Sequence, residues 1–345
     1  MSSTPRTVLE AQSLTRTFDV SRPWLQRTLA REPRRTLRAV DGVTFAIPSG
    51  TTLALVGESG CGKSTVARLA TGLYAPSSGT IRFEGQDLAA ARRDPALRRR
   101  MNMIFQDPYA SLNPRWRVQD IVAEPLRAFQ LLTTRHDIQA RTAQLLTQVG
   151  LSPADGQKYP HEFSGGQRQR ISIARALSSE PQFLVADEPT SALDVSVQAQ
   201  ILNLLRDLQQ QFGLTYLFIS HNLAVVRHMS DQLGVMYLGR IVEQGPADTI
   251  FRTPRHPYTR LLLDAIPDLA MSGRPRSPVG GEVPSPITPP SGCPFHPRCP
   301  LANARCQTEK PGQTQDTDVL VACHAIEEGR THPAGSTPPP RHARP

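Results

Sequence analysis

The sequence predicts an α/β fold with a mainly parallel sheet, a helical insertion and a small cysteine-rich extension. Across residues 8–245, apolar strand-like runs alternate with helical stretches, which is the pattern of a parallel sheet with crossover helices. Residues 106–179 interrupt this alternation, because they are mostly helical in pattern and lack long β-branched runs. After residue 246 prolines become frequent and four of the five cysteines follow, so a separate extension is expected there.

These changes of character divide the chain. We expect a core domain at residues 1–250 that contains the helical insertion at about 106–179. An extension with the four cysteines follows at residues 251–330, and its Pro-, Gly- and Ser-rich stretch at 272–292 reads as a linker. The Pro- and Arg-rich residues 331–345 are expected to be disordered. An early Pro- and Arg-rich interruption at 22–38 is expected to be an exposed loop.

Composition narrows the possible functions. The chain of 345 residues has a formal net charge of +9, with arginines clustered at 31–38 and 92–100. Aromatic residues are not interleaved with these arginines, which argues against a nucleic-acid platform and favours solvated loops. We see neither a signal peptide nor an apolar run of the roughly 18 residues that a membrane span needs. An intracellular protein that works on membranes only through partners is therefore expected.

The first core strand, at 52–56, leads into a phosphate-binding motif of the form G-x-x-x-x-G-K-[ST], and a helix-like run follows at 65–73. The candidate nucleotide-binding residues are Gly57, Ser59, Gly60, Cys61, Gly62, Lys63, Ser64 and Thr65. The glycines let backbone N–H groups turn toward phosphates, and the helix N-terminus adds partial positive charge. Lys63 is expected to reach the β- and γ-phosphates and Ser64 to hold Mg²⁺. Cys61, at a free position, is a candidate for a lowered thiol pKa.

A later apolar strand, 183–187, ends in two carboxylates. Asp187 is a candidate ligand of Mg²⁺, and Glu188 is placed to orient or deprotonate an attacking water. Such a strand end is weak evidence alone, but it gains weight from the phosphate motif upstream. A second glycine-rich helix start, at Ser164, Gly165, Gly166 and Gln167, opens a helix-like run to residue 177 and is also suited to an anion.

The segment Phe163-Ser164-Gly165-Gly166-Gln167 closely resembles the signature of the ABC ATPases, usually LSGGQ. The resemblance covers roughly residues 8–250 and implies a head-to-tail dimer, in which each signature closes on the ATP held by the partner's phosphate loop. It also implies roles for three further residues. Gln106 matches the glutamine that touches metal and water, Asp194 belongs to the loop that crosses the dimer interface, and His221 matches the histidine that contacts the γ-phosphate.

A narrower resemblance is to the F-type ATPases of oligopeptide, dipeptide and nickel importers. This resemblance rests on the sequences of residues 39–43, 57–62 and 106–114, on the motif His256-Pro257-Tyr258-Thr259, and on the cysteine segment. It implies two membrane permease subunits, a second ATPase subunit forming a heterodimer, and an extracytoplasmic solute-binding protein, with this chain at the cytoplasmic face of the membrane. Peptides are the expected solute, and nickel or another small solute is the alternative. A soluble ATPase acting on ribosomes or DNA would carry two cassettes or long coiled coils, which are missing here. The importer-like motifs also argue against the ATPase of an exporter.

The four clustered cysteines follow the pattern Cys293-x5-Cys299-x6-Cys306-x16-Cys323. Four thiolates suit a [4Fe–4S] cluster or tetrahedral zinc. The long spacings and the importer resemblance favour the iron–sulfur cluster, with zinc, disulfides or unliganded thiols as alternatives. A structural role is expected, because the segment is far in sequence from the catalytic motifs and has too few apolar residues to build its own core.

Overall fold

The computed structural model describes residues 6–24, 26–27, 33–91, 94–265 and 282–330. Its main sheet has eight strands, and a second sheet has four. In spatial order the main sheet contains β11 (Thr314–Asp316), β12 (Val319–Val321), β10 (Arg240–Pro246), β9 (Gln232–Tyr237), β3 (Thr52–Val56), β8 (Thr215–Ile219), β7 (Phe183–Asp187) and β6 (Met101–Ile104). Strands β9, β3, β8, β7 and β6 pair in parallel, while β10, β11 and β12 add antiparallel pairs at one edge. The predicted α/β fold with a mainly parallel sheet is confirmed.

Both faces of the central strands are covered, which explains their unbroken apolar sequences. All residues of β3, β7 and β8 are buried. Along β3, Leu53 and Leu55 pack in one hydrophobic cluster with Val66, whereas Ala54 and Val56 pack in another with Leu205. The alternation of side chains along the strand thus supplies the two faces of the sheet with separate cores.

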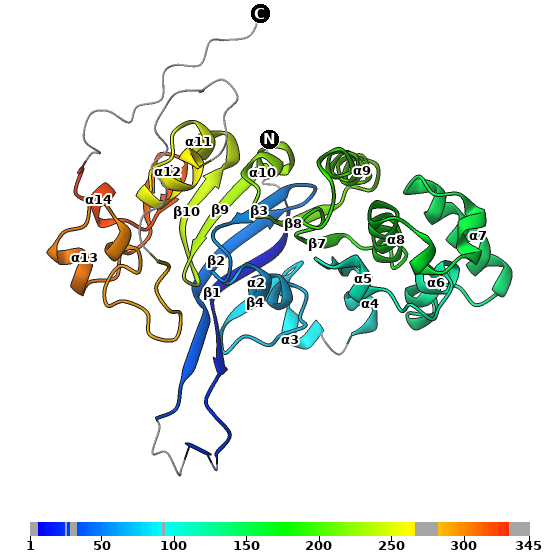
Figure 1. Ribbon diagram of the computed structural model, residues 1–345, viewed down its shortest axis with the longest axis horizontal. Coiled ribbons are helices and arrows are strands. Elements are labelled where there is room, and N and C mark those ends of the chain that lie inside the picture. The colour runs from blue at the N-terminus through cyan, green and yellow to red at the C-terminus, as the bar shows by residue number, and fades with distance from the viewer. Residues whose placement is uncertain (1–5, 25, 28–32, 92–93, 266–281, 331–345) are drawn as a thin grey trace, which may run out of the picture.

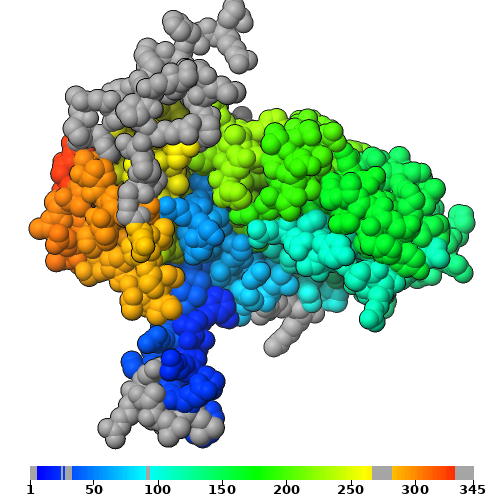
Figure 2. Space-filling model, in the orientation of Figure 1, coloured from blue at the N-terminus to red at the C-terminus, as the bar shows by residue number. Residues whose placement is uncertain are grey.

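The four-stranded antiparallel sheet was not predicted from the sequence. It contains β1 (Thr7–Asp19), β2 (Thr36–Pro48), β4 (Ser78–Phe83) and β5 (Gln86–Asp87), in the order β2-β1-β4-β5. Strands β1 and β2 continue past the body of the molecule as a long hairpin (Figures 1 and 2). Of the residues 22–38 that were expected to form a loop, the described residues 33–35 are exposed and outside any strand, whereas 36–38 already belong to β2.

Helix α2 begins at Lys63, two residues earlier than the sequence pattern suggested. The helices of the core and insertion are α2 (Lys63–Ala70), α3 (Leu88–Ala91), α4 (Pro95–Arg98), α5 (Pro108–Ser111), α6 (Val118–Ala128), α7 (Arg135–Gln148), α8 (Gly165–Leu177), α9 (Val195–Phe212) and α10 (Leu223–Met229), with 3₁₀ turns η1 (Pro153–Gln157) and η2 (Pro160–Glu162). Helix α8 starts at Gly165 because the Ser164 hydroxyl accepts a hydrogen bond from the Gln167 N–H. Between β6 and β7 the structure is helical, and this insertion lies beyond β7 in Figure 1.

The extension continues the main sheet. Its elements are α11 (Ala247–Arg252), α12 (Pro257–Asp264), η3 (His296–Arg298), α13 (Ala304–Thr308), α14 (His324–Glu327) and strands β11 and β12. Strand β12 pairs with the edge strand β10, joining Glu243 with Val321. Phe295, Val319 and Val321 are buried in the hydrophobic cluster that also contains Ala54 and Val56 of β3. The extension therefore gains order from the sheet edge, on the side of the molecule opposite the helical insertion (Figures 1 and 2).

Two expectations lie outside the described residues, namely the disordered tail at 331–345 and the first part of the linker, residues 272–281. Within the described part of the chain, no helix combines the length and the apolar character that crossing a bilayer demands.

Candidate functional site

The sequence-predicted catalytic residues meet at one edge of the main sheet. Four neighbouring parallel strands, in the order β3-β8-β7-β6, each end beside one of them. The phosphate loop follows β3, His221 follows β8, Asp187 ends β7 with Glu188 directly after it, and Gln106 follows β6. The carboxyl edge of a parallel sheet is where open α/β folds bind ligands. Segments far apart in the sequence are therefore brought together by strand order.

The phosphate loop at 57–62 depends on glycine at two positions. Gly57 has a φ of +149° and Gly62 a φ of +109°, where other residues are strained. A Cβ on Gly57 would lie 2.2 Å from the Met236 carbonyl oxygen, and one on Gly62 would lie 2.2 Å from the Ala39 carbonyl oxygen. The loop is thus packed tightly against neighbouring backbone at both glycines.

Lys63 begins α2 and turns back over the loop. Its buried ammonium donates hydrogen bonds to the carbonyl oxygens of Gly57 at 2.8 Å and Glu58 at 2.9 Å. Of the other predicted loop residues, Ser59 and Gly60 are exposed, while Thr65 lies half-buried in the first turn of α2. This arrangement places one positive charge and a helix N-terminus at the mouth of the loop, which suits a phosphate chain.

Ser64 and Asp187 form a pair of oxygen donors. The Ser64 hydroxyl donates to Asp187 Oδ1 at 3.1 Å, although the two residues come from α2 and β7. Burial raises the pKa of Asp187, and the adjacent Glu188 carboxylate raises it further. Hydroxyl and carboxylate oxygens are the ligands that Mg²⁺ prefers, so this donor set fits the ion expected there.

Glu188 connects two other predicted residues. Its Oε2 accepts a hydrogen bond from the Gln106 side-chain amide at 3.1 Å, and its Oε1 lies 3.1 Å from His221 Nδ1. Glu188 has a φ of +48°, in the left-handed region that is uncommon for a residue with a side chain. Its N–H donates to the Ile219 carbonyl oxygen at 2.9 Å, which ties the strained residue to β8. The sheet thus holds Glu188 in a defined position between amide and imidazole.

The signature residues lie on another part of the molecule. Ser164, Gly165 and Gln167 are exposed at the start of α8 in the helical insertion, and Gly166 is buried. Asp194 is exposed immediately before α9. Among the described residues, no hydrogen bond or ion pair joins the signature to the phosphate loop of the same chain. The structure of one chain therefore brings together all predicted catalytic residues but leaves the signature apart.

The expectation of an acidic Cys61 thiol is wrong. Cys61 is buried inside the loop, and this burial raises the pKa of its thiol despite the nearby Lys63 ammonium. The side chain packs in the hydrophobic cluster that also contains Val66, so it behaves as a small apolar group.

The predicted iron–sulfur cluster is also wrong. In the described residues, which include all five cysteines, no group of three or more His, Cys, Asp or Glu side chains is arranged to hold a metal ion. All five cysteines are free thiols. Burial raises the pKa of Cys293 to about 11 and that of Cys299 to about 12, and a metal ligand would have to be a thiolate. Cys293, Cys306 and Cys323 instead pack in the core that joins the extension to the sheet.

One set of contacts at the loop was missed from the sequence. Arg298 of the extension forms an ion pair with Glu58 inside the phosphate loop, and the Tyr258 hydroxyl accepts a hydrogen bond from the Glu58 N–H. In the sequence, the motif around Tyr258 is the one signal for these contacts, and it assigns no role to Tyr258 or Arg298. Partners 240 residues apart leave no local pattern.

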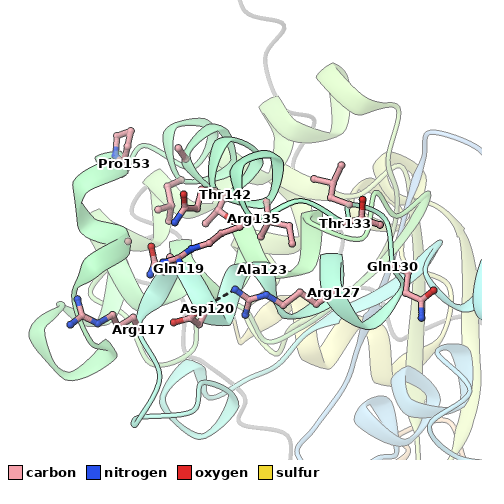
Figure 3. A pocket seen from close by; sticks show the side chains of 16 residues that line it. Arg117, Gln119, Asp120, Ala123, Arg127, Gln130, Thr133, Arg135, Thr142 and Pro153 are labelled. Atoms are coloured by element: carbon pink, nitrogen blue, oxygen red, sulfur yellow. Dashed lines mark hydrogen bonds and ion pairs between the residues drawn. The ribbon is translucent and has the colours of Figure 1, made fainter.

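A separate cavity lies in the helical insertion. Its volume is about 800 Å³, and it lies between α6, α7 and η1 (Figure 3). Arg117, Arg127 and Thr142 are among its lining residues, and Arg127 pairs with Asp120 beside it. None of the predicted catalytic residues lines it, so it is distinct from the site at the sheet edge.

Comparison with known proteins agrees with this geometry. The family described as ABC transporter matches residues 40–191, and the family described as oligopeptide/dipeptide transporter, C-terminal region, matches residues 242–306. The di/tripeptide transport ATP-binding protein DppF of Pseudomonas aeruginosa (strain UCBPP-PA14) is 51% identical over 325 residues, which cover 93% of this chain and 98% of that protein. The oligopeptide transport ATP-binding protein OppF of Escherichia coli (strain K12) is 50% identical over 302 residues, covering 86% and 90%.

A solved structure supports the fold and the family. That of cbiO1 from Clostridium perfringens, described as part of the ABC transporter complex cbiONQ, is 28% identical, with a TM-score of 0.60 over 72% of this chain and 92% of that chain. The chain matches nearly the whole length of the DppF relative, and about half of the matched residues are identical. The chain therefore belongs to the ABC transporter family, among the ATP-binding proteins that carry the oligopeptide/dipeptide transporter C-terminal region.

Proposed function

We propose that this chain binds Mg-ATP at the phosphate loop and hydrolyses it to energise the uptake of oligopeptides or dipeptides through partner permeases. Membership of the ABC transporter family supports ATP hydrolysis coupled to transport. The observation that carries the peptide assignment is similarity along almost the whole chain to proteins named for peptide transport, including the C-terminal region. Nickel and other small solutes are less well supported, because the relatives quoted above are named for peptides.

Each catalytic residue has a proposed task. Lys63 and the loop N–H groups bind the β- and γ-phosphates. Ser64, Asp187 and Gln106 would hold Mg²⁺, which neutralises charge on the phosphates. Glu188 orients the attacking water and accepts its proton, and His221, which is exposed beside it, contacts the γ-phosphate.

The complete site requires a second ATPase subunit. The signature residues Ser164, Gly165, Gly166 and Gln167 form an exposed helix start away from their own phosphate loop. We place this helix start against the ATP of an opposing subunit, with Asp194 at the shared interface, and infer a heterodimer with a second ATPase. An exposed, capped helix N-terminus is suited to the terminal phosphate of a nucleotide.

The remaining partners follow from the proposed role. Two permease subunits would carry the solute, and an extracytoplasmic solute-binding protein would deliver it to them. This chain would act as a peripheral subunit at the cytoplasmic face of the membrane. Similarity to transport ATP-binding proteins supports this placement, and no role in nucleic-acid binding is proposed.

Two substitutions separate binding from hydrolysis. Lys63→Ala should weaken ATP binding at least tenfold, because the ammonium beside the β- and γ-phosphates is lost. Glu188→Gln should keep ATP binding and lose 10²–10⁴-fold in turnover, the usual contribution of a positioned base. Nucleotide affinity is measured by equilibrium binding and turnover by phosphate release. Unchanged ATP affinity in Lys63→Ala, or more than about a tenth of normal turnover in Glu188→Gln, would contradict the site.

Uptake by cells tests the solute. A strain in which this chain is deleted should lose accumulation of a labelled dipeptide or tetrapeptide. The normal chain should restore it, whereas the Glu188→Gln chain should not. Nickel accumulation is measured in the same cells, and loss of nickel uptake with unchanged peptide uptake would replace the proposed solute by the alternative.

A further inference from the structure

The phosphate loop contains a carboxylate that its chemistry does not use. Glu58 follows Gly57 directly, and its side chain is 24% exposed. A bound nucleotide brings several negative charges to this loop. An unpaired carboxylate there would repel them, because charges a few ångströms apart interact strongly near a protein surface. Something must neutralise Glu58 if the loop is to bind phosphate well.

Arg298 supplies the opposite charge from the extension. Its Nη1 donates to Glu58 Oε2 at 2.8 Å and its Nη2 donates to Glu58 Oε1 at 2.8 Å, a bidentate pair. The Arg298 side chain is only 3% exposed, and its Nη1 also lies 3.3 Å from the Tyr237 hydroxyl. The planar guanidinium matches the carboxylate in both charge and shape, which a lysine could not do.

Tyr258 holds the backbone of the same loop residue. The Glu58 N–H donates to the Tyr258 hydroxyl at 3.0 Å. Tyr258 is fully buried in the first turn of α12, where His256 Nδ1 accepts a hydrogen bond from its N–H. Its ring packs against Tyr237 and Phe295, with centroids 4.7 and 5.4 Å away. Burial and packing against these two rings thus fix the hydroxyl beside the loop.

These contacts make one connected support. Lys63 Nζ donates to the Glu58 carbonyl oxygen, so the carboxylate, N–H and carbonyl groups of Glu58 are each held. Two of these three contacts with Glu58, those of Arg298 and Tyr258, come from the extension. We propose that Arg298 and Tyr258 are positioning residues for the phosphate loop, through which the extension sets the affinity of the chain for nucleotide. This inference rests on the proposed function, because it assumes that the loop binds ATP.

The first test removes the charge of Arg298. Arg298→Gln should raise the Kd for Mg-ATP and the KM for ATP about tenfold, within the usual range for directly interacting residues. The kcat at saturating ATP should stay within about twofold of the normal value, since Glu188 and His221 lie on other strands. Arg298→Lys keeps the charge but loses the bidentate pairing, so its KM should lie between those of the normal protein and Arg298→Gln. An unchanged KM in Arg298→Gln would overturn the proposal.

A double substitution separates charge from folding. Glu58→Gln/Arg298→Gln leaves neither charge unpaired, so its Kd should return to within about threefold of the normal value. A double variant as weak as Arg298→Gln would overturn the proposal, because the effect would then not pass through Glu58. If Arg298→Gln does not fold, the same comparison is made between Arg298→Lys and the double variant. Arg305→Gln is the matched control: Arg305 lies in the same extension, pairs with Glu309 and Glu328, and should leave the Kd unchanged.

The hydroxyl of Tyr258 is tested separately. Tyr258→Phe keeps the ring and should raise the Kd about fivefold, the value of one hydrogen bond. Tyr216→Phe is its control, since the Tyr216 hydroxyl is also buried but donates to the Leu205 carbonyl oxygen at 3.0 Å. Equal effects of the two variants on Kd would contradict a role at the loop.

Lys63→Ala distinguishes failure of this inference from failure of the proposed function. If Lys63→Ala binds ATP normally, the loop is not the nucleotide site and both fail. If Lys63→Ala loses ATP while Arg298→Gln and Tyr258→Phe do not, only the positioning role fails.

Discussion

Two adjacent carboxylates, Asp187 and Glu188, end the same strand in different surroundings. Asp187 is 3% exposed and accepts one hydrogen bond from Ser64. Glu188 follows the strand, has a left-handed backbone conformation itself, and lies between Gln106 and His221. A proposed metal ligand and a proposed base are thus separated by a backbone turn at one residue.

The raised pKa of Asp187 has a consequence for stability. Burial makes the folded protein bind this proton more tightly than the unfolded chain, whose carboxyl has a pKa near 3.8. The free energy of unfolding therefore falls as the pH rises from about 4 through the raised pKa, because the folded protein then loses this proton. Asp187→Asn should raise the free energy of unfolding at pH 7 by about 1 kcal/mol when measured in urea with EDTA and without nucleotide.

Two measurements check this prediction. The gain should shrink as the pH is lowered toward 4, because protonation then removes the buried charge of the normal Asp187. Asp207→Asn, on the exposed face of α9, should change the free energy of unfolding by less than about 0.5 kcal/mol. A destabilised Asp187→Asn protein at pH 7, or a gain independent of pH, would disprove the assignment.

At the scale of elements, β12 attaches the extension to the core. Its Val319 and Val321 are fully buried, and its pairing with β10 continues the sheet. From its sequence, the proline-rich extension needs something else to order it, and a metal cluster is the natural expectation. The structure replaces that metal by a sheet edge and a shared hydrophobic core, to which buried cysteines contribute as apolar groups.

Loss of this packing should release the extension. Val321→Asp places a carboxylate among apolar side chains, which costs several kcal/mol when no partner is available. We expect cleavage by a protease within residues 282–330 to become at least about tenfold faster, followed by mass spectrometry of the fragments. Gln315→Asp, at an exposed position of the neighbouring β11, should be cleaved like the normal chain. An unchanged cleavage pattern in Val321→Asp would show that β12 is not the attachment.

At the scale of the whole molecule, the site at the sheet edge and the signature lie on different parts of the chain (Figure 1). The proposed activity therefore requires a second subunit, and specific activity should fall on dilution as subunits separate. Constant specific activity down to nanomolar protein would contradict the shared site.

Mixing two inactive variants sharpens this test. Lys63→Ala lacks a working phosphate loop, and Gly165→Asp places a carboxylate in the signature. If the chain can pair with itself, an equal mixture should recover up to about a quarter of normal activity, since half of the dimers are mixed and each contains one intact site. If it pairs only with another ATPase, the same pattern should appear when the variants are placed in the two subunits. No recovery in either format would disprove head-to-tail sharing.

The parallel core and the residues gathered at its edge are predictable from the sequence. These depend on local patterns: an apolar strand before a glycine-rich loop, a strand ending in Asp187 and Glu188, and a capped helix after Ser164. The order of parallel strands then brings such motifs to one edge, whatever their separation along the chain.

The remaining features arise from contacts between segments that are distant in the sequence. The antiparallel sheet of β1, β2, β4 and β5 depends on pairing between strands whose register no local pattern specifies. The neutral Cys61 and Cys293 thiols depend on burial by distant residues. The pairing of Arg298 with Glu58 joins residues 240 positions apart, which meet only when the extension packs against the core. Burial and side-chain pairing are properties of the assembled core, so the sequence supplies the partners while the fold selects them.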